Sequence, residues 1–181
     1  MNSNILLTGG LGYIGAHTAY ELISAGHNLV IVDNLCNSSK KVLARLESLV
    51  GKKIDFIKAD VRNGTALDRI FKDRDIQSVI HFAGLKSVSE SISEPLRYFD
   101  NNVVSTIELI KAMSRANVRR LVFSSSATVY GDLAKVPVSE SSRLNVTNPY
   151  GRTKLICEDI LRDLIASDSS WHLKFDTKSS F

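Results

Sequence analysis

The chain has 181 residues, of which 44% are hydrophobic and 23% charged, and its formal net charge is +4. These values are typical of one globular domain with a sizeable core. No apolar stretch is long enough to span a bilayer and no secretory signal pattern is present, so the sequence predicts a cytoplasmic protein that does not bind membranes.

Neither the basic residues nor the cysteines are clustered. Lysines and arginines occur as short pairs separated by acidic and apolar residues, with no basic helix and no interleaved aromatic residues. This distribution favours a solvated surface over nucleic-acid binding. Cys36 and Cys157 form no CxxC pair and have no histidine cluster nearby, so we expect reduced, structural thiols and no metal site.

Short apolar runs alternate with helix-length amphipathic stretches along the whole chain. The predicted strands cover residues 4–8, 28–33, 54–59, 78–83 and 119–125, and the predicted helices cover residues 13–25, 40–50, 65–73, 96–116 and 149–167. Asn148 and Pro149 form a good start for the last helix, as N-cap and first helical residue. Alternation of this kind predicts a Rossmann-type, doubly wound parallel α/β sheet, with its ligand crevice at the carboxyl ends of the strands.

The first predicted strand runs into a glycine loop. Gly9, Gly12 and Gly15 follow the strand at the spacing GxxGxxG and open the first helix. Glycine permits the tight turn and lets backbone N–H groups approach a pyrophosphate, whose charge the helix N-terminus favours. This context predicts a dinucleotide site.

Acidic and small residues end the next three strands. Asp33 ends the second strand, where a carboxylate can accept hydrogen bonds from an adenosine ribose and repel a 2′-phosphate, which favours NAD over NADP. The alternative is that Asp33 is only a turn residue. Asp60 ends the third strand, and Phe82, Ala83 and Gly84 end the fourth, so all of them are expected at the same edge of the sheet.

A second group of residues has the composition of a proton-transfer site. Tyr150 and Lys154 are four residues apart on one helix and therefore share a face. An ammonium beside the phenol lowers the tyrosine pKa, which makes Tyr150 a candidate general base. Ser126, at the end of the fifth strand, is placed to bond the same substrate oxygen.

Six segments together carry a specific family resemblance. They are TGGLGYIG at 8–15, DNLCNS at 33–38, HFAGLK at 81–86, DNNV at 100–103, SSSATVYG at 124–131 and NPYGRTK at 148–154. They closely resemble the corresponding segments of the UDP-glucose 4-epimerases, a family of extended short-chain dehydrogenases/reductases. The resemblance covers about residues 4–171.

The resemblance implies an NAD-dependent interconversion of UDP-galactose and UDP-glucose, through transient oxidation at C4 of the sugar. It implies that Ser126, Tyr150 and Lys154 are catalytic, with Tyr150 taking the proton of the 4-hydroxyl. It implies that the NAD-binding residues are Gly9, Gly12, Tyr13, Ile14, Gly15, Asp33, Asn34, Asn37, Ser38, Asp60, Val61, Phe82, Ala83, Gly84, Lys86, Asn101, Tyr150 and Lys154. His81 is expected to be a satisfied histidine at a strand end.

The resemblance stops after Trp171. Residues 1–171 are expected to form the NAD-binding domain, and residues 172–181 a divergent tail that either adds a sixth strand or is disordered. The family's C-terminal substrate-binding lobe is missing, as in a truncated or frameshifted product. The three catalytic residues are therefore expected to face an open, wet crevice.

Three functions remain open at this point. The chain is an epimerase of doubtful activity, a non-catalytic NAD-binding fragment, or another extended-family enzyme such as a nucleotide-sugar dehydratase. Dehydratases usually carry an acidic pair where this chain has Ala127 and Thr128. A homodimer is also expected, through the predicted helices at 96–116 and 149–167, with apolar residues Leu109, Ile110, Met113, Leu161 and Leu164.

Overall fold

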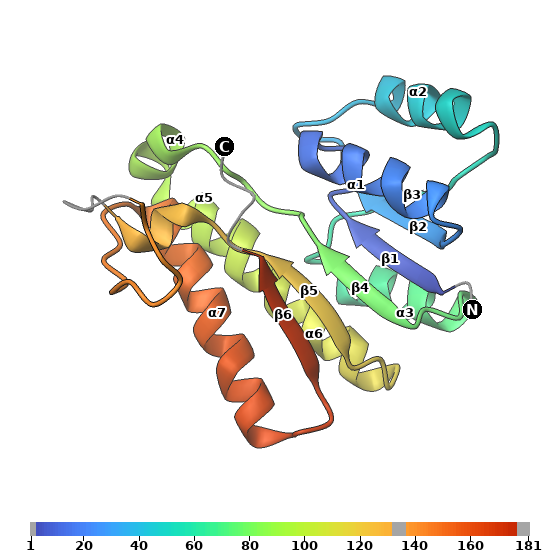
Figure 1. The fold of residues 1–181 in the computed structure, drawn as a ribbon. Coiled ribbons are helices and arrows are strands. Elements are labelled where there is room, and N and C mark those ends of the chain that lie inside the picture. The colour runs from blue at the N-terminus through green and yellow to red at the C-terminus, as the bar shows by residue number, and fades with distance from the viewer. Residues whose placement is uncertain (1–2, 132–136, 177–181) are drawn as a thin grey trace.

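The computed structural model describes residues 3–131 and 137–176, in which six parallel strands form one sheet with helices on both faces (Figure 1). The strands are β1 (Asn4–Thr8), β2 (Asn28–Asp33), β3 (Asp55–Lys58), β4 (Ser78–His81), β5 (Arg120–Ser124) and β6 (His172–Asp176). Their order across the sheet is β3-β2-β1-β4-β5-β6. The order reverses between β1 and β4, which is where doubly wound sheets open a crevice. The predicted fold class is therefore confirmed.

The helices cover the two faces of the sheet in separate groups. On one face lie α1 (Tyr13–Ser24) and α2 (Lys40–Val50), and on the other lie α3 (Gly64–Asp73), α6 (Ser105–Arg115) and α7 (Pro149–Ser167). Successive side chains of a strand point to opposite faces, so Leu6 of β1 packs with the second group while Ile5 and Leu7 pack with the first. Both faces of the central strands are thus buried, which explains their continuous apolar sequence.

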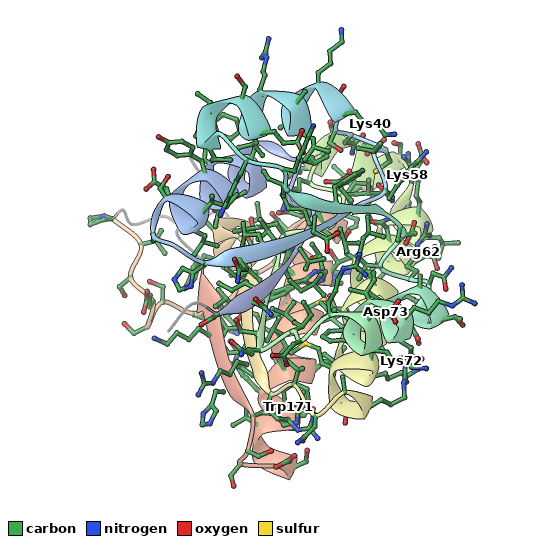
Figure 2. The ribbon with its side chains drawn as sticks, turned by 90° about the vertical axis from the view of Figure 1, so that its right-hand side faces the viewer. Lys40, Lys58, Arg62, Lys72, Asp73 and Trp171 are labelled. Carbon is green, nitrogen blue, oxygen red and sulfur yellow. The ribbon has the colours of Figure 1, made fainter. Side chains whose placement is uncertain are left out.

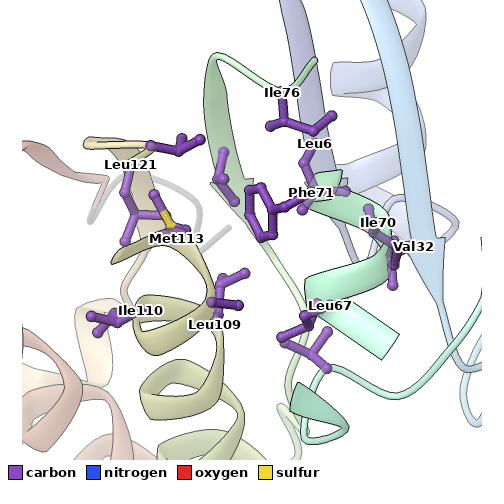
Figure 3. Packing of buried hydrophobic residues seen from close by; sticks show 14 of the residues in the cluster. Leu6, Val32, Leu67, Ile70, Phe71, Ile76, Leu109, Ile110, Met113 and Leu121 are labelled. Carbon is purple, nitrogen blue, oxygen red and sulfur yellow. The ribbon is translucent and has the colours of Figure 1, made fainter. Parts of the chain in front are cut away.

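The larger hydrophobic cluster lies between the sheet and helices α3 and α6 (Figure 3). Leu6, Leu67, Leu109 and Met113 have no exposed side-chain surface there. Full burial of a side chain of this size contributes about 1.5–3 kcal/mol relative to exposure. This layer therefore holds the strands rigidly in the register that brings their carboxyl ends together.

The helix predicted over residues 96–116 is present from Pro95 to Arg115, but it contains a π-helical stretch that was not predicted. The structure divides this segment into α5 (Pro95–Tyr98), a π-helical segment η1 (Phe99–Val104) and α6. The wider π turn changes which side chains face inward, and it buries Asn102, whose side chain bonds Leu85 and Thr153. Two short elements were also not predicted, α4 (Val88–Ser93) and the 3₁₀ turn η2 (Ala127–Tyr130).

The segment after Trp171 forms the sixth strand, so of the two alternatives for the tail the strand is the one observed. β6 pairs with β5 in parallel, and the His172 N–H donates to the Arg119 carbonyl at 2.8 Å. Trp171 is buried, with the Arg119 guanidinium 4.9 Å from its ring centroid. In Figure 2, Trp171 lies far from α2, at the opposite end of the molecule. Residues 177–181 of the predicted tail lie outside the described residues.

The remaining strand differences are at the ends. β4 stops at His81 and β5 at Ser124, earlier than predicted, and Phe82, Ala83 and Gly84 after β4 line the cavity described below. In the part of the chain that the structure describes, no helix is both long and apolar enough to cross a membrane.

Candidate functional site

A cavity of about 240 Å³ opens at the carboxyl ends of β1 to β4. It is lined by Gly9, Gly12, Tyr13, Ile14, Gly15, Val32, Asp33, Asn34, Cys36, Asn37, Ser38, Ala59, Asp60, Val61, Phe82, Ala83, Gly84, Lys86, Asn101 and Ser105. Every residue predicted to bind the dinucleotide lies in this lining, except Tyr150 and Lys154. The sequence analysis missed Val32, Cys36, Ala59 and Ser105, since apolar strand ends, a loop thiol and a helical serine carry no chemical signal of their own.

The glycine loop forms the floor of the cavity and requires glycine at two positions by direct contact. Gly9 has a φ of 68°, and a Cβ there would lie 2.6 Å from the backbone nitrogen of Ala83. A Cβ on Gly15 would lie 2.3 Å from the Gly9 carbonyl oxygen. The loop therefore packs directly against β4 and against the first turn of α1, which brings that turn to the cavity.

The N-terminus of α1 has no capping side chain. Its N-cap is Gly12, whereas α2, α3 and α7 are capped by Ser39, Asn63 and Asn148 respectively. No acidic residue occurs in the first turn of α1 either. The first N–H groups of a helix need partners, and together with the helix dipole they attract an anion. The N-terminus of α1 thus offers uncapped N–H groups where the glycine loop predicts a pyrophosphate.

Asp33 joins the glycine loop to the loop that follows β2. One carboxylate oxygen accepts hydrogen bonds from the Leu35 N–H at 2.9 Å and the Ser38 hydroxyl at 2.7 Å, and the other accepts from the Leu11 N–H at 3.1 Å. A carboxylate offers about four lone-pair positions, so roughly one remains for a ligand hydroxyl. Its role in the turn therefore still leaves acceptor capacity facing the cavity.

Asp60 is held by an arginine that also reaches η1. The Arg62 guanidinium and backbone N–H bond the Asp60 carboxylate, and the guanidinium pairs with Asp100 as well. The hydrogen bonds from Arg62 lower the pKa of Asp60 to about 2, and the Asn34 amide adds to the effect. Arg62 thereby fixes the end of β3 against the π-helical segment that carries Asn101.

The three candidate catalytic side chains lie beside the cavity. Ser126, Tyr150 and Lys154 are all at least nine-tenths buried, which corrects the expectation of an open, wet crevice. The Tyr150 ring is covered by Leu85 and by Tyr98, which packs against it in a T-shaped arrangement at 6.4 Å between ring centroids.

The expected effect of Lys154 on Tyr150 is wrong. Burial raises the pKa of Tyr150, although a hydrogen bond with Ser126 acts in the opposite direction. The Lys154 ammonium instead donates to the Ser124 carbonyl at 2.8 Å and lies 4.7 Å from the centroid of the Phe123 ring. Burial, with a contribution from the positive charge of Lys86, lowers the pKa of Lys154 to about 7.

Asn102 is a site residue that the sequence analysis did not identify. Its amide oxygen accepts from the Leu85 N–H at 2.8 Å, and its amide nitrogen donates to the Leu85 carbonyl and the Thr153 hydroxyl. It therefore joins the loop after β4, which carries Lys86, to helix α7. Its neighbour Asn101 was predicted, but only the π turn reveals that Asn102 faces inward.

The remaining predicted residues are placed as follows. His81 has a partner on each ring nitrogen, Thr8 and Thr106, so it is the satisfied histidine that was expected. Cys36 and Cys157 are both free thiols. Among residues 3–131 and 137–176, no cluster of His, Cys, Asp or Glu side chains is arranged to hold a metal ion.

Proteins similar to this chain in sequence and in fold include UDP-glucose 4-epimerases, as the motifs indicated. The enzyme from Dictyostelium discoideum is 55% identical over 172 residues, which are 95% of this chain and 50% of that protein. The solved Bifidobacterium longum enzyme in complex with NAD⁺ and UDP has a TM-score of 0.94 at 44% identity, over 96% of this chain and 52% of that one. The Stenotrophomonas maltophila enzyme with bound NAD and formylated UDP-arabinopyranose has a TM-score of 0.93 at 45% identity and covers the same shares.

The chain spans about half the length of the curated relatives it matches. The family model described as GDP-mannose 4,6 dehydratase matches residues 6–174, which is nearly the whole chain. This match includes the glycine loop, both catalytic candidates on α7 and most of β6. The chain therefore belongs to the GDP-mannose 4,6 dehydratase family, and its similar relatives within it are UDP-glucose 4-epimerases.

Proposed function

We propose that this chain binds NAD in the cavity at the carboxyl edge of its sheet and forms the dinucleotide-binding half of a UDP-glucose 4-epimerase. The observation that carries the proposal is the convergence of the glycine loop, Asp33, Asp60 and the Phe82–Gly84 strand end on one cavity beside the uncapped N-terminus of α1. These residues lie far apart in the sequence, and a purely structural role does not require their polar groups to line the same space.

The polar groups fit the parts of a dinucleotide in order along the cavity. The first turn of α1 offers N–H groups to a pyrophosphate, and Asp33 retains acceptor capacity for a ribose hydroxyl. Asp60 and Val61 line the end assigned to adenine. Lys86 and Asn101 line the part nearest α7, because Lys86 is close enough to affect the charge of Lys154.

The proposed reaction of the whole enzyme is the interconversion of UDP-galactose and UDP-glucose. When bound, NAD accepts a hydride from C4 of the sugar and returns it to the opposite face. Ser126 and Tyr150 share a hydrogen bond and are the groups placed to handle the proton of the sugar 4-hydroxyl. Lys154 anchors α7 to the end of β5 through the Ser124 carbonyl.

The sequence left two alternatives to an epimerase open, a nucleotide-sugar dehydratase and a non-catalytic NAD-binding fragment. A nucleotide-sugar dehydratase is disfavoured because Ala127 and Thr128 follow Ser126, and the Thr128 hydroxyl donates to Ser126 at 2.9 Å where an acidic pair would stand. A non-catalytic NAD-binding fragment is favoured by the raised pKa of Tyr150 and by the half-length match to the relatives. UDP-sugar is therefore proposed as the substrate of the whole enzyme.

The proposed homodimer needs other side chains than most of those named from the sequence. Leu109, Ile110, Met113 and Leu161 are buried in the core of this chain, so they are not available to a second subunit. The large apolar side chains left exposed nearby include Ile92 on α4 and Leu96 on α5. A dimer through these short helices remains a proposal.

The NAD assignment is tested by calorimetric titration of the chain with NAD and with NADP. We expect NAD to bind at least about tenfold more tightly, a difference of about 1.4 kcal/mol, because the Asp33 carboxylate opposes a 2′-phosphate. Asp33→Asn keeps the size of the side chain and one acceptor oxygen but removes the charge, so it narrows the difference in affinity between NAD and NADP. Asp73→Asn, at the exposed end of α3, is the matched control and leaves the gap unchanged. Equal affinities of the parent chain for the two dinucleotides would defeat the assignment.

A further inference from the structure

Helix α7 carries a buried polar stripe that extends one turn beyond the two predicted residues. Tyr150, Lys154 and Glu158 recur every four residues and are all buried. They contact three consecutive serines, residues 124–126, at the end of β5. The first serine accepts from Lys154 through its carbonyl, the second donates its hydroxyl to Glu158, and the third bonds the Tyr150 phenol. One face of α7 thus holds the end of β5 at three points.

Glu158 is the member of this stripe to which neither the motifs nor the resemblance assigns a role. Only 3% of its surface is exposed, and a buried carboxylate is costly unless it is paired and hydrogen-bonded. Its two oxygens have separate partners, the Ser125 hydroxyl and the guanidinium of Arg162. Arg162 is half exposed and also lies over the Phe175 ring of β6. Glu158 therefore connects the last strand to the candidate catalytic group.

The charge of Lys154 depends on groups from several elements. Lys86, in the loop after β4, disfavours the ammonium, while Glu158 and Cys157 on α7 favour it. His81 of β4 is neutral near pH 7, because burial lowers its pKa to about 3. Within the described residues that act on Lys154, Glu158 is the carboxylate, and it lies one helical turn away.

We propose that Glu158 is a positioning residue for the candidate catalytic group: it fixes the end of β5 through Ser125 and supplies the negative charge that favours the ammonium form of Lys154. The inference rests on the proposed function only for the role given to Lys154. The contacts of Glu158 themselves belong to the chain without any ligand.

The test is a pH titration of Lys154 in the unliganded chain. The titration is monitored by NMR of the side-chain methylene next to the amine, and the signal is assigned with Lys154→Met. Glu158→Gln is nearly the same size but uncharged, and we expect it to move the titration midpoint to lower pH by about one pH unit. Asp159→Asn is the matched control, since Asp159 is exposed and pairs with the same Arg162 at 2.8 Å. It leaves the midpoint unchanged.

A second variant is expected to move the Lys154 titration midpoint in the opposite direction. Arg162→Met removes the partner that neutralises Glu158, so the Lys154 midpoint rises, and the half-exposed position tolerates the change. General loosening of α7 cannot move the midpoint in opposite directions in two variants. No shift in either variant, or a fall in both, would overturn the role of Glu158. NAD titrations of the same samples decide the proposed function separately, because the chain can fail to bind NAD while Glu158 still controls Lys154.

Discussion

His81 shows how burial sets the protonation state of a single residue near the site. Thr106 donates its hydroxyl to the Asn102 carbonyl at 2.8 Å, so it accepts from the His81 Nε2–H at 3.2 Å. This leaves His81 Nδ1 to accept from the Thr8 hydroxyl at 2.6 Å. The neutral ring is fully bonded, and burial lowers its pKa to about 3.

This arrangement predicts a loss of stability in acid. The unfolded chain binds a proton at His81 below about pH 6.5 whereas the folded chain does not, so the free energy of unfolding falls as pH drops from about 6.5 toward 3, by up to about 1.4 kcal/mol per pH unit. Urea unfolding at several pH values should show that the free energy of unfolding of His81→Asn falls less steeply with decreasing pH than that of the parent. His172→Asn, at an exposed position, is the control. An unchanged dependence in His81→Asn would contradict the prediction.

The roles of single residues could be predicted from sequence only where local context decides them. The cap residue Asn148 is determined by its neighbours in the chain, and it is placed as expected. The pKa of Tyr150 is not local, because the ring is covered by Leu85 and Tyr98, which lie more than fifty residues earlier. The four-residue spacing correctly placed Lys154 on the same face, but it could not show that the ammonium points to the Ser124 carbonyl.

At the scale of elements, the start of α7 positions both candidate catalytic residues on this helix. The Asn148 side chain accepts from the Gly151 N–H at 2.8 Å, and Pro149 occupies the first helical position. Replacing such a cap with alanine costs about 1 kcal/mol. We therefore expect Asn148→Ala to lower the free energy of unfolding in urea by about this amount, whereas Asn148→Asp, which keeps an acceptor, loses less. Equal stability of the alanine variant and the parent would show that the cap is dispensable.

The elements with a long periodic pattern were predicted closely, and the failures have a common cause. β2 and α2 have the predicted bounds, since strong apolar or amphipathic patterns end there at polar residues or glycine. The segment 96–116 also has a helical pattern, but the π turn η1 has no periodicity of its own that a sequence reveals. The alternation of Leu173 and Phe175 was compatible with a strand, and only pairing with β5 decides it.

At the scale of the whole molecule, the cavity was predictable because topology alone places it. Parallel strands in this order bring their carboxyl ends to one edge, so residues found at strand ends line a single space. The burial of Ser126, Tyr150 and Lys154 was not predictable. That of Tyr150 depends on contacts far along the chain, since Ser91 of α4, a helix that was not predicted, accepts a hydrogen bond from the Tyr150 N–H at 3.1 Å.

We expect the 181-residue chain by itself to bind NAD but not to epimerise UDP-galactose at a useful rate. Holding a substrate in the reactive geometry can supply about 7 to 11 kcal/mol of barrier lowering, and the chain spans half of the relatives whose whole length performs the proposed reaction. The structure adds a second reason, because burial raises the pKa of Tyr150 and so keeps its phenol protonated.

The measurement is conversion of UDP-galactose by the purified chain, followed by NMR of the sugar anomeric proton. Fusion of the remaining half of a relative, such as the Bacillus subtilis enzyme that is 49% identical to this chain, should restore turnover, and Tyr150→Phe should abolish it in the fusion. Restoration by the fusion would locate the deficit in substrate positioning, since the dinucleotide cavity is the same in both proteins. Turnover by the unfused chain that disappears in Tyr150→Phe would instead show that the buried tyrosine is already competent, and that the residues of this half suffice to hold the sugar.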